Sequence, residues 1–109
     1  MPSSAYRLVR EAIVRRQQVL ATYQGLPRSF CPHAIGFKQG VAHCLVYQFA
    51  GRSRSRAIVP HSPDNWRCML VDALHDLRVR EGAWYTAFNF VEPSTCIDEI
   101  DLAVISWPR

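Results

Sequence analysis

After residue 16 the chain consists of short β-like runs separated by turn residues, and this alternation constrains its fold more than any other feature. Gly, Pro, Asn and Asp gather at 24–27, 38–40 and 63–65, where such residues favour tight turns. The runs between them are 19–23, 30–37, 41–49, 66–71 and a last one from 74 or 77 to 79. The pattern predicts a five-stranded antiparallel meander.

Strands this short must curl to bury one face, so we expect a small Sm-like or SH3-like barrel rather than an open sheet. The run 41–49 is apolar on both alternating faces and is expected to be the central strand. Before the strands, Ser3 and Ser4 are candidate N-caps, and Tyr6, Val9 and Ile13 recur at helical spacing. The expected fold class is therefore mainly β (α+β), with an N-terminal helix.

The length of 109 residues suits one domain, with the barrel over about residues 17–80 and an aromatic-rich C-terminal extension over 81–109. The aromatic side chains of 84–90 either pack on the barrel or form a platform for stacking bases. The first alternative predicts that Trp84 is substantially buried. Near Asp98 the chain is expected to begin a final edge strand or a short helix.

Four cysteines are widely spaced, form no C-x-x-C pair and have apolar neighbours; they are Cys31, Cys44, Cys68 and Cys96. This spacing predicts no metal site, no cofactor and four reduced, buried thiols. A reducing, cytoplasmic location follows from free thiols. We expect no membrane association, because the chain has no secretory signal pattern and no apolar stretch of spanning length.

Positive charge is concentrated in the first half of the chain. Residues 1–56 hold nine basic residues and one acidic residue, whereas residues 57–109 hold four basic and eight acidic residues. The asymmetry indicates a surface that faces polyanions or self-complementary association, unless folding mixes the two halves. Within the break at 50–65, Arg52, Arg54 and Arg56 alternate with serines. As a loop, this run would either present guanidinium groups that can donate paired hydrogen bonds to phosphate oxygens, or be a flexible connection without a function.

Three groups of residues follow the order of a known family. They are Tyr23-Gln24-Gly25 with Arg28, Pro32 and Ile35-Gly36, then His43-Cys44-Leu45 with Tyr47, and then the run from Arg67 to Leu74. In this order and spacing, residues 8 to 80 resemble the WYL domain, an Sm-like barrel found mostly in bacterial regulators. The resemblance implies the barrel fold.

The resemblance also implies a function, since the family's late basic positions are associated with binding nucleic acid or nucleotides. Here Arg67 is retained, whereas Leu70 and Ala73 replace two of the family's three arginines. Relatives carry a helix-turn-helix domain for which this chain has no room, so we do not expect direct control of transcription. The charge is expected to have moved to the loop arginines.

Catalysis is not expected. Cys31 and His33 are the nearest candidates for nucleophile and base, but no third orienting group or oxyanion donor is recognisable. The prediction is a non-catalytic, regulatory, ligand-binding module for nucleic acid or a nucleotide-type anion; the alternative is a module that recruits a protein or a second copy through its aromatic tail or barrel edge. The predicted anion-binding residues are Arg28, His33, Tyr47, Arg52, Arg54, Arg56 and Arg67. For Arg67, a salt bridge to Asp64 or Asp72 is the structural alternative.

Overall fold

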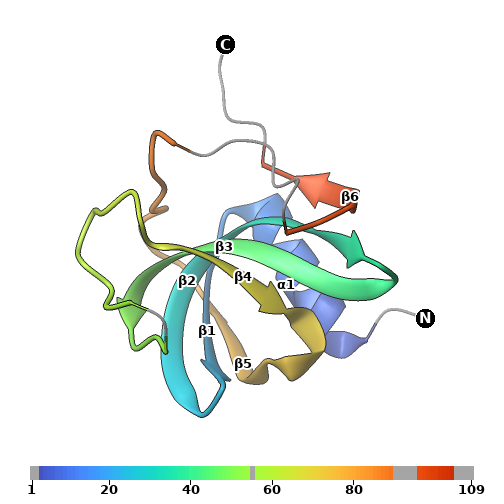
Figure 1. The fold of residues 1–109 in the computed structure, drawn as a ribbon, viewed down its shortest axis with the longest axis horizontal. Coiled ribbons are helices and arrows are strands. Elements are labelled where there is room, and N and C mark those ends of the chain that lie inside the picture. The colour runs from blue at the N-terminus through green and yellow to red at the C-terminus, as the bar shows by residue number, and fades with distance from the viewer. Residues whose placement is uncertain (1–2, 55, 90–95, 105–109) are drawn as a thin grey trace.

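The structure is a computed structural model that describes residues 3–54, 56–89 and 96–104. Its elements are α1 (Ser4–Arg15), β1 (Gln18–Tyr23), β2 (Leu26–Lys38), β3 (Val41–Gly51), β4 (Trp66–Leu70), the 3-10 helix η1 (Val71–Ala73), β5 (His75–Arg80) and β6 (Glu99–Ala103). Figure 1 shows one N-terminal helix packed against a curved sheet. The mainly β fold with this helix confirms the coarse prediction.

Helix α1 begins and ends as its sequence predicts. The Ser3 side chain accepts a hydrogen bond from the backbone N–H of Tyr6, which satisfies one of the unpaired donors of the first turn. The helix stops at Arg16, whose backbone is left-handed. Its buried side chains come from one face, at Tyr6, Val9, Ala12 and Ile13.

The strands form an antiparallel sheet in the order β4-β3-β2-β1-β5, with β6 paired to β2. The central strand is therefore β2, and the expectation that the run 41–49 is central was wrong. Strand β3 is apolar on both faces for another reason. Its outer face carries Leu45, which packs against a small cluster formed by Cys96 and Ile97 near the C-terminus.

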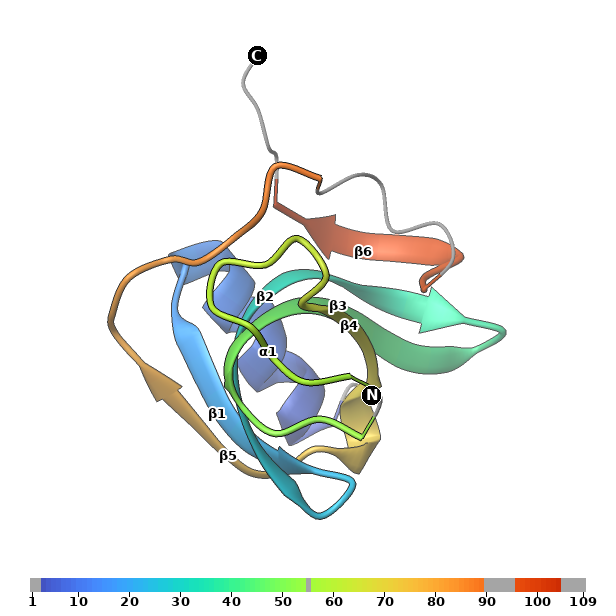
Figure 2. The same ribbon diagram turned by 60° about the vertical axis from the view of Figure 1, so that its left-hand side comes forward.

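Strand β2 divides one of its edges between two partners. Residues 26–30 pair with β1, and residues 34–37 pair with β6, while β3 pairs along the other edge. The register with β3 shifts between Pro32 and Ala34. Pro32 has no N–H to donate to the ladder. Figure 2 shows β1 and β6 beside different parts of β2.

The sheet does not close into the predicted barrel. In the part of the chain that the structure describes, no ladder joins β4 to β5, and η1 connects them instead. Helix α1 shares the main core with this connection, because Val9 and Ile13 belong to the same buried cluster as Val71 and Leu74. The observed architecture is a six-stranded, open, curved sheet with a helix completing its core.

The C-terminal extension lies on the outside of the sheet. Trp84 is half-buried rather than substantially buried, with its ring 4.8 Å from that of His33, and Phe88 is 92% exposed. Phe90 lies outside the described residues. Farther along, residues 96–104, here called the C-terminal strap, contain β6, so the edge strand and not the short helix is present.

The prediction of four reduced cysteines was wrong. Cys68 and Cys96 form a disulfide with a Cα–Cα distance of 5.7 Å, whereas Cys31 and Cys44 are free and buried. Their separation of 28 residues gives no local signal, because only the docking of the strap beside β4 brings them together. No helix in the described ranges is both long and apolar enough to cross a membrane.

Candidate functional site

A basic hollow of about 310 Å³ lies between the β1–β2 turn, the β3–β4 loop and β4, and we call it the arginine hollow. Its lining residues are Tyr23, Gln24, Arg28, Ser53, Arg54, Arg67, Cys68 and Met69. Three of these are arginines and none is an acid. The lining therefore provides a net positive charge to any molecule that enters the hollow.

Arg28 is the most unusual member, because it is only 3% exposed. Its Nη1 donates to the Gln48 side chain at 3.3 Å, and its Nη2 donates to the Tyr23 carbonyl and to the Gln24 side chain at 3.3 and 3.2 Å. All three acceptors are neutral. The guanidinium also lies over the Tyr23 ring, 5.3 Å from its centroid. Its Nε atom is buried, and no hydrogen-bond acceptor for it lies within the described part of the chain.

The surroundings of Arg28 favour an added negative charge. Burial lowers its pKa, and the neighbouring charges of Arg67 and Arg54 lower it further. Arginine nevertheless stays protonated in proteins. Among the described residues, no carboxylate lies within salt-bridge distance of Arg28. A buried guanidinium without a counter-charge is costly, and a bound anion would offset that cost.

Arg67 organises the loop that forms one wall of the hollow. Its Nε donates to the Ser53 hydroxyl at 3.1 Å, and its two terminal nitrogens donate to the carbonyl oxygens of Arg56, Asp64 and Trp66 at 2.9 Å. The predicted alternative, a salt bridge from Arg67 to Asp64 or Asp72, was therefore wrong. Arg67 donates to a hydroxyl and to backbone carbonyl oxygens instead. Asp64 accepts through its backbone, and its carboxylate pairs with Arg56 at 3.8 Å.

Five of the seven predicted site residues are arginines, and these fall into two sets. Arg28, Arg54 and Arg67 line the arginine hollow, whereas Arg52 and Arg56 belong to the same loop but are not part of the lining. Both are exposed. Of the three alternating arginines of the loop, only Arg54 therefore lines the hollow.

Tyr47 and His33 lie in the packed interior, away from the lining of the hollow. The Tyr47 hydroxyl donates to the Ser62 carbonyl at 2.7 Å, which fixes the β3–β4 loop. His33 is 1% exposed, and the centroid of its ring lies 4.8 Å from those of both Trp66 and Trp84. Burial lowers its pKa to about 4, so the ring is neutral near pH 7.

Cys31 and His33 are not arranged as a nucleophile and its base. Burial raises the pKa of the Cys31 thiol to about 11, so the thiol stays protonated. Its Sγ accepts a hydrogen bond from the Tyr85 backbone at 3.3 Å. The nearby His33 Nδ1 contacts the Cys31 carbonyl oxygen at 2.8 Å instead of the sulfur. Reactive cysteines have the opposite environment, with a depressed pKa and an adjacent base.

Sequence reasoning missed the neutral residues that hold Arg28. Gln48 is fully buried within the apolar strand β3, and its amide nitrogen donates to the carbonyl oxygens of Ala50 and Arg52 while its oxygen faces Arg28. A lone amide inside an apolar strand was the signal available, since buried polar groups need partners. Tyr23 and Gln24 gave no such signal.

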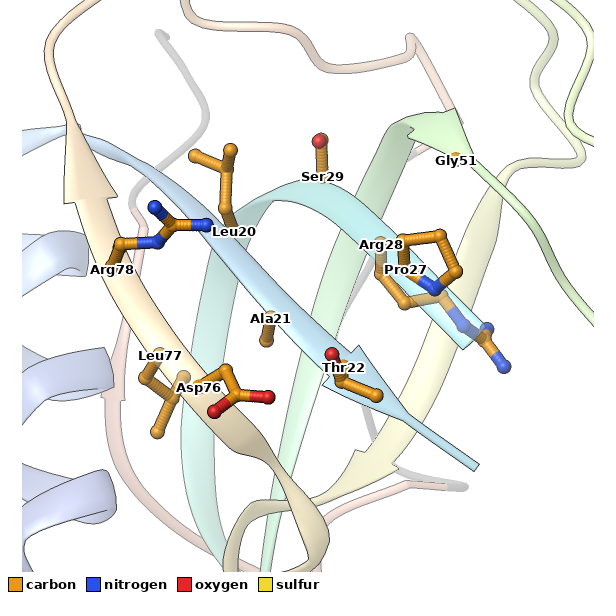
Figure 3. Close-up of a pocket in the computed structure, with 10 residues that line it drawn as sticks. All are labelled: Leu20, Ala21, Thr22, Pro27, Arg28, Ser29, Gly51, Asp76, Leu77 and Arg78. Atoms are coloured by element: carbon orange, nitrogen blue, oxygen red, sulfur yellow. The ribbon is translucent and has the colours of Figure 1, made fainter. Parts of the chain in front are cut away.

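A second hollow, of about 480 Å³, lies on the outer face of β1, β2 and β5. Figure 3 shows its lining, in which Asp76 and Arg78 provide opposite charges and the Arg28 side chain leads away from both. Its mixed charge does not select for an anion. No group of three metal-ligating side chains occurs in the described ranges.

Comparisons with family models, curated proteins and solved structures gave no match to this chain. The assignment of function therefore depends on the geometry of the arginine hollow.

Proposed function

We propose that this domain is a non-catalytic module that binds a phosphate-bearing anion, such as a nucleotide or a single nucleic-acid strand, in the arginine hollow. The observation that carries the proposal is the burial of Arg28 with no carboxylate partner among residues 3–54, 56–89 and 96–104. Guanidinium groups match phosphate oxygens through paired, charge-assisted hydrogen bonds. Arg54 lies exposed at the rim, where it would meet the ligand first.

The WYL resemblance supports this proposal in its topology as well as in its residues. The helix, the four-stranded meander and the return of β5 to pair with β1 are compatible with a divergent, open Sm-like barrel. Family members bind nucleic-acid or nucleotide ligands, and Arg67 occupies one of the positions concerned. A regulatory role is proposed on the same ground, with no cofactor.

One observation favours recruitment of a protein as a second function. Phe88 is 92% exposed on the C-terminal extension, and a large exposed aromatic side chain is a common interface anchor. The strands at the two ends of the sheet order, β4 and β5, are further candidates for pairing with a partner or a second copy. A cytoplasmic location stays a prediction, although a disulfide is more common in oxidising compartments.

The anion proposal can be tested by titrating labelled single-stranded oligonucleotides and cyclic nucleotides at two salt concentrations. The variants are Arg28→Met and Arg54→Ala, with Arg52→Ala as the matched control from the same loop. We expect Arg28→Met and Arg54→Ala each to weaken binding about tenfold, and Arg52→Ala to change it much less. If three phosphates are neutralised on a single strand, log K should fall with log salt with a slope of about −2.

Two outcomes would contradict the anion proposal. The first is no detectable binding of any of these anions by the wild type. The second is equal binding by all variants, which would place the contact outside the arginine hollow. Because Arg28 is buried, its variant is first checked for cooperative unfolding. Arg54→Ala keeps the test decisive if Arg28→Met does not fold, since Arg54 is exposed.

A further inference from the structure

The C-terminal strap, residues 96–104, is packed largely outside the main core. Its Cys96 and Ile97 side chains form a separate small cluster with Ala34. The buried members of the main cluster all come from residues 6–74, and the strap contributes only the partly buried Leu102 and Val104 to it. The strap therefore shares little buried side-chain surface with the main core.

Noncovalent contacts hold the strap at a few places. The Asp98 N–H donates to the Phe37 carbonyl at 2.9 Å, and the Val104 N–H donates to the His33 carbonyl at 2.7 Å. Between them β6 pairs with residues 34–37 of β2. The Asp101 carboxylate accepts hydrogen bonds from Tyr6 and Arg10 of α1 at 2.7 and 2.9 Å.

The covalent contact of the strap is the disulfide between Cys96 and Cys68 of β4. Its two ends differ in access to solvent, because Cys68 is exposed and Cys96 is only 4% exposed. A reductant can therefore reach the bond from the Cys68 side. The two remaining cysteines, Cys31 and Cys44, are fully buried.

We propose that the Cys68–Cys96 disulfide is a reducible latch that holds the strap on the sheet, so that reduction releases the strap and leaves the main core folded. A thiolate of a dithiol reductant attacks the exposed Cys68 sulfur and expels the Cys96 thiolate. The second thiol of the reductant then displaces Cys68 and closes its own disulfide. The protein gains two electrons and two protons, and the reductant loses them.

The free cysteines do not compete in this exchange. Burial raises the pKa of Cys31 to about 11 and that of Cys44 to about 12, so neither forms a thiolate near neutral pH. The Cys44 side chain also belongs to the main core, on the other side of β3 from the cluster that contains Cys96. The disulfide therefore opens to the reductant and does not pass to another internal thiol.

Release of the strap would change the surface that the domain presents. Residues 34–37 of β2 would lose their β6 partner, leaving a row of unpaired N–H and C=O groups on that edge. Ala34 and Leu45, which pack against Cys96 and Ile97, would become accessible. Asp101 would separate from Arg10, which would leave α1 with a more positive surface.

Amide hydrogen exchange of the whole chain, before and after treatment with a dithiol, tests the latch. Intact mass first establishes the gain of two hydrogens. We expect exchange at Asp98 and Val104 to accelerate about tenfold to a hundredfold on reduction, since the disulfide no longer restricts the opened strap. Exchange in the β1–β2 hairpin should change little.

The matched variant is Cys68→Ser, which removes the latch at its exposed end. It should show the fast strap exchange without any reductant, and the dithiol should not change it further. Three outcomes would overturn the proposal: strap exchange unaffected by reduction, loss of protection throughout the core, or a Cys68 thiol that alkylates fully in the untreated protein. None of these readouts depends on anion binding.

Discussion

The Nε2 atom of His33 lies 2.9 Å from the Thr86 hydroxyl oxygen, while Nδ1 lies 2.8 Å from the Cys31 carbonyl oxygen. A carbonyl can only accept, so Nδ1 carries the proton and donates. Nε2 then accepts from the Thr86 hydroxyl. This neutral tautomer fastens the extension after β5 to the buried part of β2, and burial of the ring is what keeps it neutral.

We expect the domain to lose stability in acid because of His33. Its pKa is about 4 in the folded protein and about 6.5 in an unfolded chain. As the pH falls, the unfolded chain therefore gains a proton on His33 before the folded protein does. The stability that neutral His33 contributes is complete above about pH 6.5. It falls by about 3 kcal/mol as the pH drops to about 4. Urea unfolding at several pH values measures the change.

His33→Gln provides the control, because glutamine can keep both hydrogen bonds but cannot gain a proton near pH 5. The variant should be less stable than the wild type at pH 7 and should lose less stability between pH 6.5 and 4. Parallel curves for the two proteins would mean that another group causes the acid sensitivity.

Arg67→Ala should loosen the loop between β3 and β4. The substitution removes four hydrogen bonds to the loop and to the start of β4, and it should lower the free energy of unfolding by about 2 kcal/mol. Limited proteolysis should show faster cleavage between residues 52 and 64. Arg78→Ala, an exposed arginine of β5, should leave the cleavage rate unchanged, and equal rates for both variants would refute the role of Arg67.

Gly36→Ala should disturb the docking of the C-terminal strap. A Cβ at this position would overlap the Glu99 carbonyl oxygen and come within 2.7 Å of Ile97 Cγ2, so β6 would have to move away from β2. We expect a loss of about 2 kcal/mol. Amides of the strap should exchange faster, whereas those of the β1–β2 hairpin should be unaffected. A wild-type exchange pattern would show that the strap can shift without cost.

The fold was predictable from sequence where the signal was local. The cap at Ser3 and the apolar spacing of Tyr6, Val9 and Ile13 specify α1, and alternation between turn residues specifies β1 to β5. Closure into a barrel was not predictable, because it depends on whether β4 and β5 meet across η1. The pairing of β6 with β2 joins segments more than sixty residues apart, and no local pattern encodes such a contact.

The site was predictable only in part, for a related reason. The WYL resemblance selected Arg28 and Arg67, and the alternation with serine selected Arg54. The same alternation also selected Arg52 and Arg56, which lie on the loop outside the hollow. Arg52, Arg54 and Arg56 are all exposed, so only the folded arrangement of the loop decides which of them lines the hollow. The neutral acceptors around Arg28 come from β1, its turn and β3, so no single segment reveals them.

The division of one β2 edge between β1 and β6 has a consequence for any shortened form of this domain. A chain ending at Arg80 would keep all the buried residues of the main cluster and lose only the partly buried Leu102 and Val104. One edge of residues 34–37 would then have no paired strand. Open strand edges are templates for pairing between molecules. We therefore expect such a fragment to self-associate through the edge that β6 covers in the longer chain.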